Sequence, residues 1–196
     1  MILRILEWTL GLSAIAALVI FQPELRLRLL RLGRRRRHVH ALHDLEESEL
    51  VDEITDAVER LSRANIGAIV VIEGSVSLEE YVETGTRLAA RVGADLLVSI
   101  FSPYGPLHDG AVLIGGDTIF AAGVILPLTQ FPVADRTLGT RHRAALGITE
   151  ESDALAIVVS EETAQVSMAQ AGRIERDVDS ERLRRALAAM FTAGVS

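Results

Sequence analysis

Apolar and polar positions alternate with two different periods along residues 44–196. Leu50, Ile54, Val58 and Leu61 recur at helical spacing with acidic residues between them. This pattern predicts a helix that begins at Asp44 and ends at the turn residues 65–67. Residues 94–101 are mostly apolar and are ambiguous between a helix and a strand.

Six short runs of β-branched and small apolar residues predict strands, over 68–72, 111–114, 118–125, 154–159, 165–169 and 173–178. Gly115-Gly116-Asp117 and Ala171-Gly172 are turn signals that join two pairs of these runs into hairpins. Further helices are predicted over 77–92, with an interruption near 84–85, and over 138–150. Asp179 is expected to cap a last helix that runs to about Phe191. The order of elements predicts an α/β fold with a mixed central β-sheet flanked by helices.

Trp8 to Phe21 form an uncharged, mostly apolar run, and an arginine-rich stretch follows it. The run alone is shorter than the roughly 20 residues of a full span, but apolar residues before it extend it. Because positive charge follows the run, the domain after it is expected in the cytoplasm. We therefore expect a transmembrane or membrane-anchor helix over 1–22, a basic linker over 23–43 and a domain over 44–196, held at the cell membrane by a single pass. A soluble packing helix and a signal peptide are the alternatives.

The composition removes several classes of chemistry. The chain has 196 residues and no cysteine, and all 20 of its basic residues are arginine. Thiol nucleophiles, cysteine-ligated zinc, Schiff-base lysines and a Walker P-loop are therefore excluded. Aromatic residues make up only 4%, which argues against a single-strand nucleic-acid binder built on stacking platforms. Any phosphate group must be bound by arginine and by backbone N–H groups.

One candidate site is the string Leu107-His108-Asp109-Gly110-Ala111, which follows a turn rich in proline and glycine and precedes a predicted strand. An aspartate in this place can bind a divalent cation or accept a proton from a hydroxyl. Gly110 allows a ligand to approach the backbone closely. The alternative is an Asx-turn, in which the Asp109 carboxylate caps only its own backbone.

A second candidate site is the string Thr140-Arg141-His142-Arg143 at the start of a predicted helix. Free N–H groups and the helix dipole favour an anion there, whereas cations are unfavourable unless an anion compensates them. Arg141 and Arg143 are therefore interpreted as phosphate ligands. The alternative is a solvated pair that bridges to surface acids. His142 can bind a phosphate or hold the loop.

Three motifs together resemble the catalytic domain of the diadenylate cyclases. They are residues 106–112 around Asp109, residues 139–145 around Arg141, and Val159-Ser160-Glu161-Glu162-Thr163. Residues 21–26 resemble the flank of the membrane-bound CdaA type, just after its last transmembrane helix. The resemblance covers the chain from about Ile5 to Asp179.

The resemblance implies an enzyme that condenses two ATP into cyclic di-AMP and releases two diphosphates. It also implies a head-to-head homodimer in which the 3′-hydroxyl of each nucleotide attacks the α-phosphate of the other, so activity should depend on dimerisation. A divalent cation (Mg²⁺, Mn²⁺ or Co²⁺) is the implied cofactor. A membrane-anchored regulatory protein is a further implied partner, and no nucleic acid is expected.

The resemblance also assigns roles to individual residues. The implied catalytic residues are Asp109, Arg141, His142 and Arg143. The implied nucleotide-binding residues are Gly110, Ala111, Leu126, Thr140, Arg141, His142, Arg143 and Ser160. The implied metal ligands are Asp109, His108 and Glu162.

Two departures from the family pattern are visible. The membrane-bound type usually has three transmembrane helices, and this chain starts at what looks like the third. Tyr104 stands where the family commonly has asparagine. Two other functions stay open: a non-catalytic adenine-nucleotide sensor on a membrane anchor, and a membrane-tethered binder that uses Arg34–Arg37.

Overall fold

The computed structural model describes residues 40–131 and 138–193. The expected anchor helix and most of the expected linker lie outside these residues. Within the described part of the chain, no helix is both long enough and apolar enough to cross a membrane. Residues 44–196 form one compact unit.

The described residues form a seven-stranded mixed sheet with the strand order β2-β4-β3-β1-β5-β6-β7. The strands are β1 (Ala68–Ile72), β2 (Thr86–Arg91), β3 (Ala111–Gly115), β4 (Thr118–Val124), β5 (Leu155–Val159), β6 (Val166–Gln170) and β7 (Arg173–Arg176). Only β1 and β3 pair in parallel among these strands, and the other neighbouring pairs are antiparallel. The predicted mixed sheet and both predicted hairpins are confirmed.

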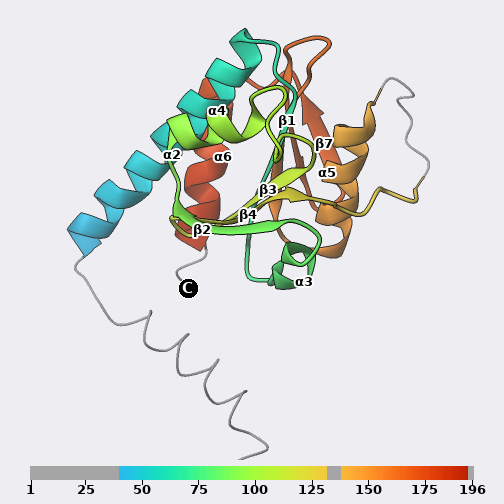
Figure 1. Ribbon diagram of the computed structural model, residues 1–196. Coiled ribbons are helices and arrows are strands. Elements are labelled where there is room, and N and C mark those ends of the chain that lie inside the picture. The colour runs from blue at the N-terminus through green and yellow to red at the C-terminus, as the bar shows by residue number, and fades with distance from the viewer. Residues whose placement is uncertain (1–39, 132–137, 194–196) are drawn as a thin grey trace, which may run out of the picture. The chain divides into compact units, whose positions relative to one another are not determined.

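Helices cover both faces of this sheet (Figure 1). The helices are α2 (His40–Arg63), α3 (Glu79–Val82), α4 (Ala94–Phe101), α5 (Thr140–Glu151) and α6 (Ser180–Ala193). Side chains of α2, α4 and α6 share one buried cluster, and those of α3 and α5 share the other. Strand β1 serves both clusters because its side chains alternate: Val70 and Ile72 join the first, whereas Ile69 and Val71 join the second.

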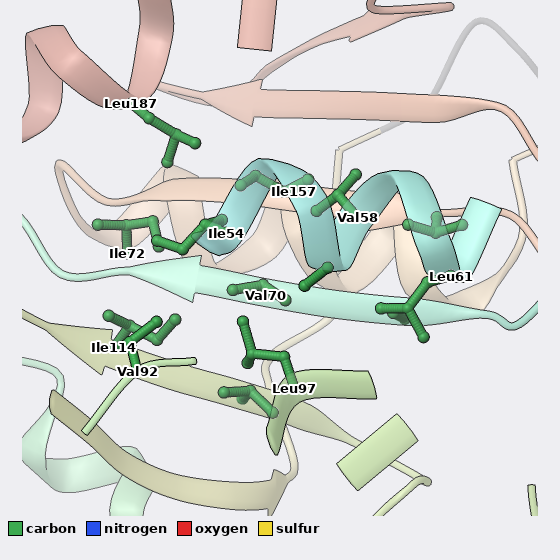
Figure 2. Close-up of a cluster of buried hydrophobic side chains, with 14 of the residues drawn as sticks. Ile54, Val58, Leu61, Val70, Ile72, Val92, Leu97, Ile114, Ile157 and Leu187 are labelled. Carbon is green, nitrogen blue, oxygen red and sulfur yellow. The ribbon is translucent and has the colours of Figure 1, made fainter. Parts of the chain in front are cut away.

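The first cluster is the larger core. Figure 2 shows Ile54, Val58 and Leu61 of α2 among the side chains of the strands and of Leu187 in α6. Full burial of one such aliphatic side chain stabilises the fold by about 1.5–3 kcal/mol. The helical spacing of apolar residues in the sequence thus corresponds to the buried face of α2.

Both ends of α2 can be compared with the sequence. The helix begins at His40 and not at Asp44, because the intervening residues include good helix formers and no breaker. Its end is as predicted: Asn65 has φ of +51°, and the N–H of Ile66 donates to the carbonyl of Leu61. This is a Schellman-type end, in which a left-handed residue satisfies the last carbonyl groups.

The ambiguous run 94–101 is the helix α4. Its N-cap residue, Gly93, offers no side-chain cap, but Glu53 of α2 accepts a hydrogen bond from the N–H of Ala94 at 2.5 Å. Leu97 and Phe101 are fully buried in the first core. The hydrogen bond from Ala94 to Glu53 and the burial of Leu97 and Phe101 therefore favour the helix. The sequence pattern alone did not distinguish this helix from a strand.

The prediction of a mostly helical segment over 77–92 was wrong. Only α3 is helical there, and residues 86–91 form β2 at the edge of the sheet, paired with β4. The segment is rich in helix-forming leucine, alanine and arginine, but backbone pairing with β4 outweighs that local preference. The strand is irregular, because its register shifts between Arg87 and Ala90 and Ala89 has φ of +52°.

The carboxylate of Asp153, just before β5, links that strand to the loop that follows β1. Asp153 accepts hydrogen bonds from the N–H groups of Ser75 and Val76, at 2.9 and 3.0 Å, and from the Ser75 hydroxyl. The hydrogen bond from the Ser75 side chain, with those from the backbone, holds the pKa of Asp153 below its ordinary value of 3.8.

We therefore expect Asp153→Asn to lower the free energy of unfolding at neutral pH by at most about 1 kcal/mol, because the carboxylate is exposed and solvent screens its interactions. Because the folded-state pKa is lowered, this contribution is present above pH 3.8 and is lost as the pH falls through the folded-state pKa. Urea titrations of both proteins from pH 7 to pH 3 measure the difference. The exposed Glu80→Gln serves as the control, and a difference that does not shrink toward pH 3 would contradict the assignment.

Candidate active site

Several segments of the predicted site meet at one end of the sheet. Strands β1 and β3 are parallel, so both begin at this end. The antiparallel pairs Ala68–Val159 and Ala111–Val124 place the ends of β5 and β4 there too. The residues next to these strand ends are Gly67, Asp109, Gly110, Leu126, Ser160, Glu161 and Glu162. Two of the three sequence motifs are thus brought together by the strand pairing alone.

The loop before β3 requires glycine at position 110. Gly110 has φ of +123°, and a Cβ there would lie 2.6 Å from the carbonyl carbon of Gly123 in β4. Asp109 directly precedes it and is exposed. Within the described chain the Asp109 carboxylate has no hydrogen-bond or ion-pair partner, so the Asx-turn alternative is not observed.

His108 is held by the turn that precedes the motif. Its Nδ1 atom lies 2.5 Å from the carbonyl oxygen of Gly105. Since a carbonyl can only accept, Nδ1 carries the proton and Nε2 is the basic nitrogen. Tyr104, in the same turn, is fully exposed and has φ of +70°. The family departure at position 104 therefore lies on the surface of this loop.

The three predicted metal ligands do not form a complete site within one described chain. Among the described residues, no three His, Asp or Glu side chains are grouped so as to hold a metal ion. Asp109 and Glu162 are exposed carboxylates without partners in the described part. Mg²⁺ is usually held by one or two carboxylates together with substrate phosphates. The donors therefore fit a cation that binds together with a nucleotide.

The second motif lies at the start of α5, as predicted. Gly139 is the N-cap and has no side-chain cap, and Thr140 is exposed. Arg143 is exposed, and its guanidinium has no partner among the described residues. An uncapped helix start with a free guanidinium is an anion-binding arrangement.

Arg141 differs from Arg143. Its Nη1 atom lies 2.9 Å from Glu161 Oε2, so an ion pair links the start of α5 to the turn after β5. The alternative weighed for these arginines, a bridge to a surface acid, is therefore observed for Arg141. For Arg143, it stays a prediction that a bound anion supplies the negative charge that compensates the helix dipole.

His142 lies on the inner side of the motif. It is buried, with 8% of its surface exposed, and its Nε2 atom lies 3.3 Å from the Ser167 hydroxyl of β6. Its imidazole is thus bound by the sheet, whereas the arginines on either side remain accessible to solvent. This contact fits the expected role of holding the motif, and direct contact of His142 with a phosphate stays a prediction.

Ser160 is half-buried and Leu126 is buried. The Ser160 hydroxyl accepts a hydrogen bond from the Thr163 N–H at 3.2 Å and shapes the turn that carries Glu161 and Glu162. Leu126 is 8% exposed and packs in the second core, whereas Ile125 beside it is 71% exposed. Ala111 is fully buried at the start of β3.

Sequence reasoning missed the segment that ties Leu126 to α5. The Thr129 N–H donates to the carbonyl of Arg143 at 3.0 Å, and the Thr129 hydroxyl donates to Glu150 at 2.5 Å. A Cβ at Gly147 would collide with the backbone of Pro127. Glycine inside a helix is unfavourable by about 1 kcal/mol. The glycine at position 147 of the predicted helix was therefore the signal in the sequence that another segment passes close to the helix there.

Comparisons with known proteins show which family this chain belongs to. Residues 55–174 match the family model DAC, described as the DisA bacterial checkpoint controller nucleotide-binding domain. The cyclic di-AMP synthase CdaA of Bacillus subtilis is 42% identical, covering 96% of this chain and 71% of that protein. A diadenylate cyclase of Listeria monocytogenes is 40% identical over 94% of this chain and 70% of its own length.

Two solved structures share the fold. DacA from Staphylococcus aureus, solved as a double mutant, has a TM-score of 0.72 and 41% identity, covering 74% of this chain and 97% of that one. A protein from Bacillus cereus described as a hypothetical membrane spanning protein has a TM-score of 0.63 and 48% identity, covering 65% of this chain and 63% of that one. By its motifs, its fold and its relatives, this chain belongs to the DAC family of nucleotide-binding domains.

Proposed function

We propose that this protein is a diadenylate cyclase that condenses two ATP into cyclic di-AMP and two diphosphates. The observation that carries the proposal is the presence, among the described residues, of two charged side chains without partners, one in each of two family motifs. The Asp109 carboxylate and the Arg143 guanidinium both lack partners among the described residues and belong to the two family motifs. The relatives named as diadenylate cyclases support the same reaction.

The reaction is an in-line displacement at phosphorus. The 3′-oxygen of one ATP forms a bond to the α-phosphorus of the other, and the bond to the bridging oxygen of the diphosphate breaks. The 3′-hydroxyl proton passes to a base, for which the free Asp109 carboxylate is the candidate. A second, equivalent displacement closes the ring.

The start of α5 binds the phosphates in this proposal. Arg143, the remaining edge of the Arg141 guanidinium, the Thr140 hydroxyl and the free N–H groups of the first turn are the donors. They neutralise the charge that develops on the departing diphosphate. His142 acts indirectly, because its contact with Ser167 sets the orientation of this turn.

The remaining site residues shape the pocket. Gly110 and Ala111 bring the backbone close to the nucleotide, and Leu126 with its exposed neighbour Ile125 provides an apolar contact for adenine. Ser160 holds the turn that presents Glu162. His108, Asp109 and Glu162 would hold the divalent cation, Mg²⁺, Mn²⁺ or Co²⁺, which supplies charge neutralisation at the phosphates when it is bound.

A head-to-head homodimer is part of the proposal, because each chain holds one nucleotide and each nucleotide attacks the other. Residues 1–22 would anchor this dimer to the cell membrane, with the catalytic domain on the cytoplasmic side. A membrane-anchored regulatory protein would be a further partner. The apolar run from Trp8 to Phe21 and the relative described as membrane spanning support the anchor.

The test is a product assay. The purified protein is incubated with ATP and with Mg²⁺, Mn²⁺ or Co²⁺, and nucleotides are separated by chromatography. The proposal predicts cyclic di-AMP with at least one of the three cations. ATP binding without any product under all three would identify a nucleotide sensor instead.

A further inference from the structure

One acidic residue of the site has no role in the reaction described above. Glu161 binds Arg141 through the 2.9 Å ion pair between Oε2 and Nη1. The Glu161 side chain is 58% exposed, and that of Arg141 is 27% exposed. Arg141 is thus more enclosed than an ordinary surface arginine, although it belongs to the phosphate-binding motif.

Gly67 provides the surface on which this ion pair lies. A Cβ at position 67 would lie 2.6 Å from Arg141 Nη1 and 2.9 Å from Glu161 Oε2. Gly67 has an ordinary φ, so the requirement for glycine here is space and not backbone conformation. The Arg141 guanidinium therefore lies against the backbone of Gly67 and is paired with the Glu161 carboxylate, so it has no space to move toward residue 67.

The electrostatics explain why a carboxylate is needed. Arg141 lies in the first turn of α5, where the helix dipole disfavours a cation. Glu161 supplies a negative charge at that position, so the arginine can keep its place before any phosphate arrives. A guanidinium has more than one hydrogen-bonding edge, and Nη1 is the atom engaged by Glu161. The other edge stays available to a phosphate.

We infer that Glu161 and Gly67 are positioning residues that fix Arg141 in its phosphate-binding orientation before ATP binds. The inference rests on the proposed function. Glu161 acts through Arg141 and not on the nucleotide, so its effect is an increase in ATP affinity by preorganisation. The opposite arrangement, in which Glu161 competes with the triphosphate for Arg141, predicts an effect of opposite sign.

The test is the steady-state kinetics of Glu161→Gln. We expect the KM for ATP to rise about fivefold, the change produced by losing an ion pair of ordinary strength, and kcat to fall by a smaller factor, because Arg141 also neutralises charge on the departing diphosphate. Glu175→Gln is the matched control, because Glu175 forms an exposed 2.8 Å ion pair with Arg182 outside the site. That variant should leave KM unchanged.

A double-mutant cycle separates positioning from a general structural effect. If Glu161 acts through Arg141, Glu161→Gln should have no further effect on KM once Arg141→Ala is present. Gly67→Ala should raise KM in the same direction, with folding checked by circular dichroism. A lower KM in Glu161→Gln, or an unchanged KM, or effects that simply add, would overturn the inference. These outcomes require an active wild-type protein, whereas a wild type that forms no cyclic di-AMP would overturn the proposed function itself.

Discussion

Asp109→Asn should reduce cyclic di-AMP formation by about 10³-fold while the protein still binds ATP. Asparagine has the same shape as aspartate but accepts no proton and carries no charge for a cation. The wild-type carboxylate is exposed and has no partner among the described residues, so the substitution removes no contact of the fold. The phosphate-binding groups at the start of α5 are unchanged, which is why binding should persist.

Product chromatography measures the first effect, and calorimetric titration with ATP measures the second. Asp117→Asn is a suitable control, because Asp117 is an exposed acid in the turn between β3 and β4. It should leave the rate unchanged. Full activity in Asp109→Asn would refute the role of Asp109 in proton transfer and cation binding.

Gly110→Ala should lower the free energy of unfolding by about 3 kcal/mol and abolish activity. Two causes act together. The φ of +123° is unfavourable for any residue with a Cβ, and the new Cβ would lie 2.6 Å from the carbonyl carbon of Gly123 and 2.9 Å from the Val124 nitrogen. These are backbone atoms of β4, so neither can rotate away, and the loop that carries Asp109 must move.

Gly116→Ala provides the matched control. Gly116 also has a positive φ, of +58°, but a Cβ there would meet nothing within 4 Å. This variant should lose only about 1 kcal/mol and keep its activity. Urea denaturation and the product assay compare the two. Equal losses of stability in both variants would show that the contact with Gly123 is unimportant.

The sequence predicted most of the fold because local pattern and tertiary environment agree along most of the chain. β1 occupies the predicted residues 68–72, and the Schellman end of α2 depends on a local Asn-Ile-Gly signal. β2 was missed because its helix-forming residues are overridden by pairing with β4, a contact between segments distant in sequence. α4 needed the carboxylate of Glu53 from another helix.

The candidate site, too, was predictable where local pattern decides and unpredictable where contacts between distant segments decide. Its motifs, and their place at strand ends and at a helix start, could be read from the sequence. The ion pair between Arg141 and Glu161 and the burial of His142 against Ser167 could not, because each joins α5 to a segment that only the folded sheet brings close. At Arg141 the Glu161 carboxylate already compensates the unfavourable helix dipole. The prediction of a bound phosphate from the helix dipole therefore applies to Arg143.

The central claim is that each chain holds half of two composite sites. In this account, Asp109 activates the 3′-hydroxyl of the nucleotide on its own chain, and that hydroxyl attacks the α-phosphate held by Arg143 of the other chain. Asp109 and Arg143 of one chain therefore serve two different bond-forming steps.

A hybrid dimer tests this claim most directly. Subunits with Asp109→Asn and subunits with Arg143→Ala are co-expressed with different tags, and the mixed dimer is purified and given saturating ATP. If the sites are composite, one site carries both substitutions and the other carries none, so a single bond forms. The account predicts one diphosphate per turnover and a linear dinucleotide, with no cyclic di-AMP. If Asp109 and Arg143 of one chain served the same step, each site would carry one defect, and a hybrid that forms no dinucleotide at all would contradict the account.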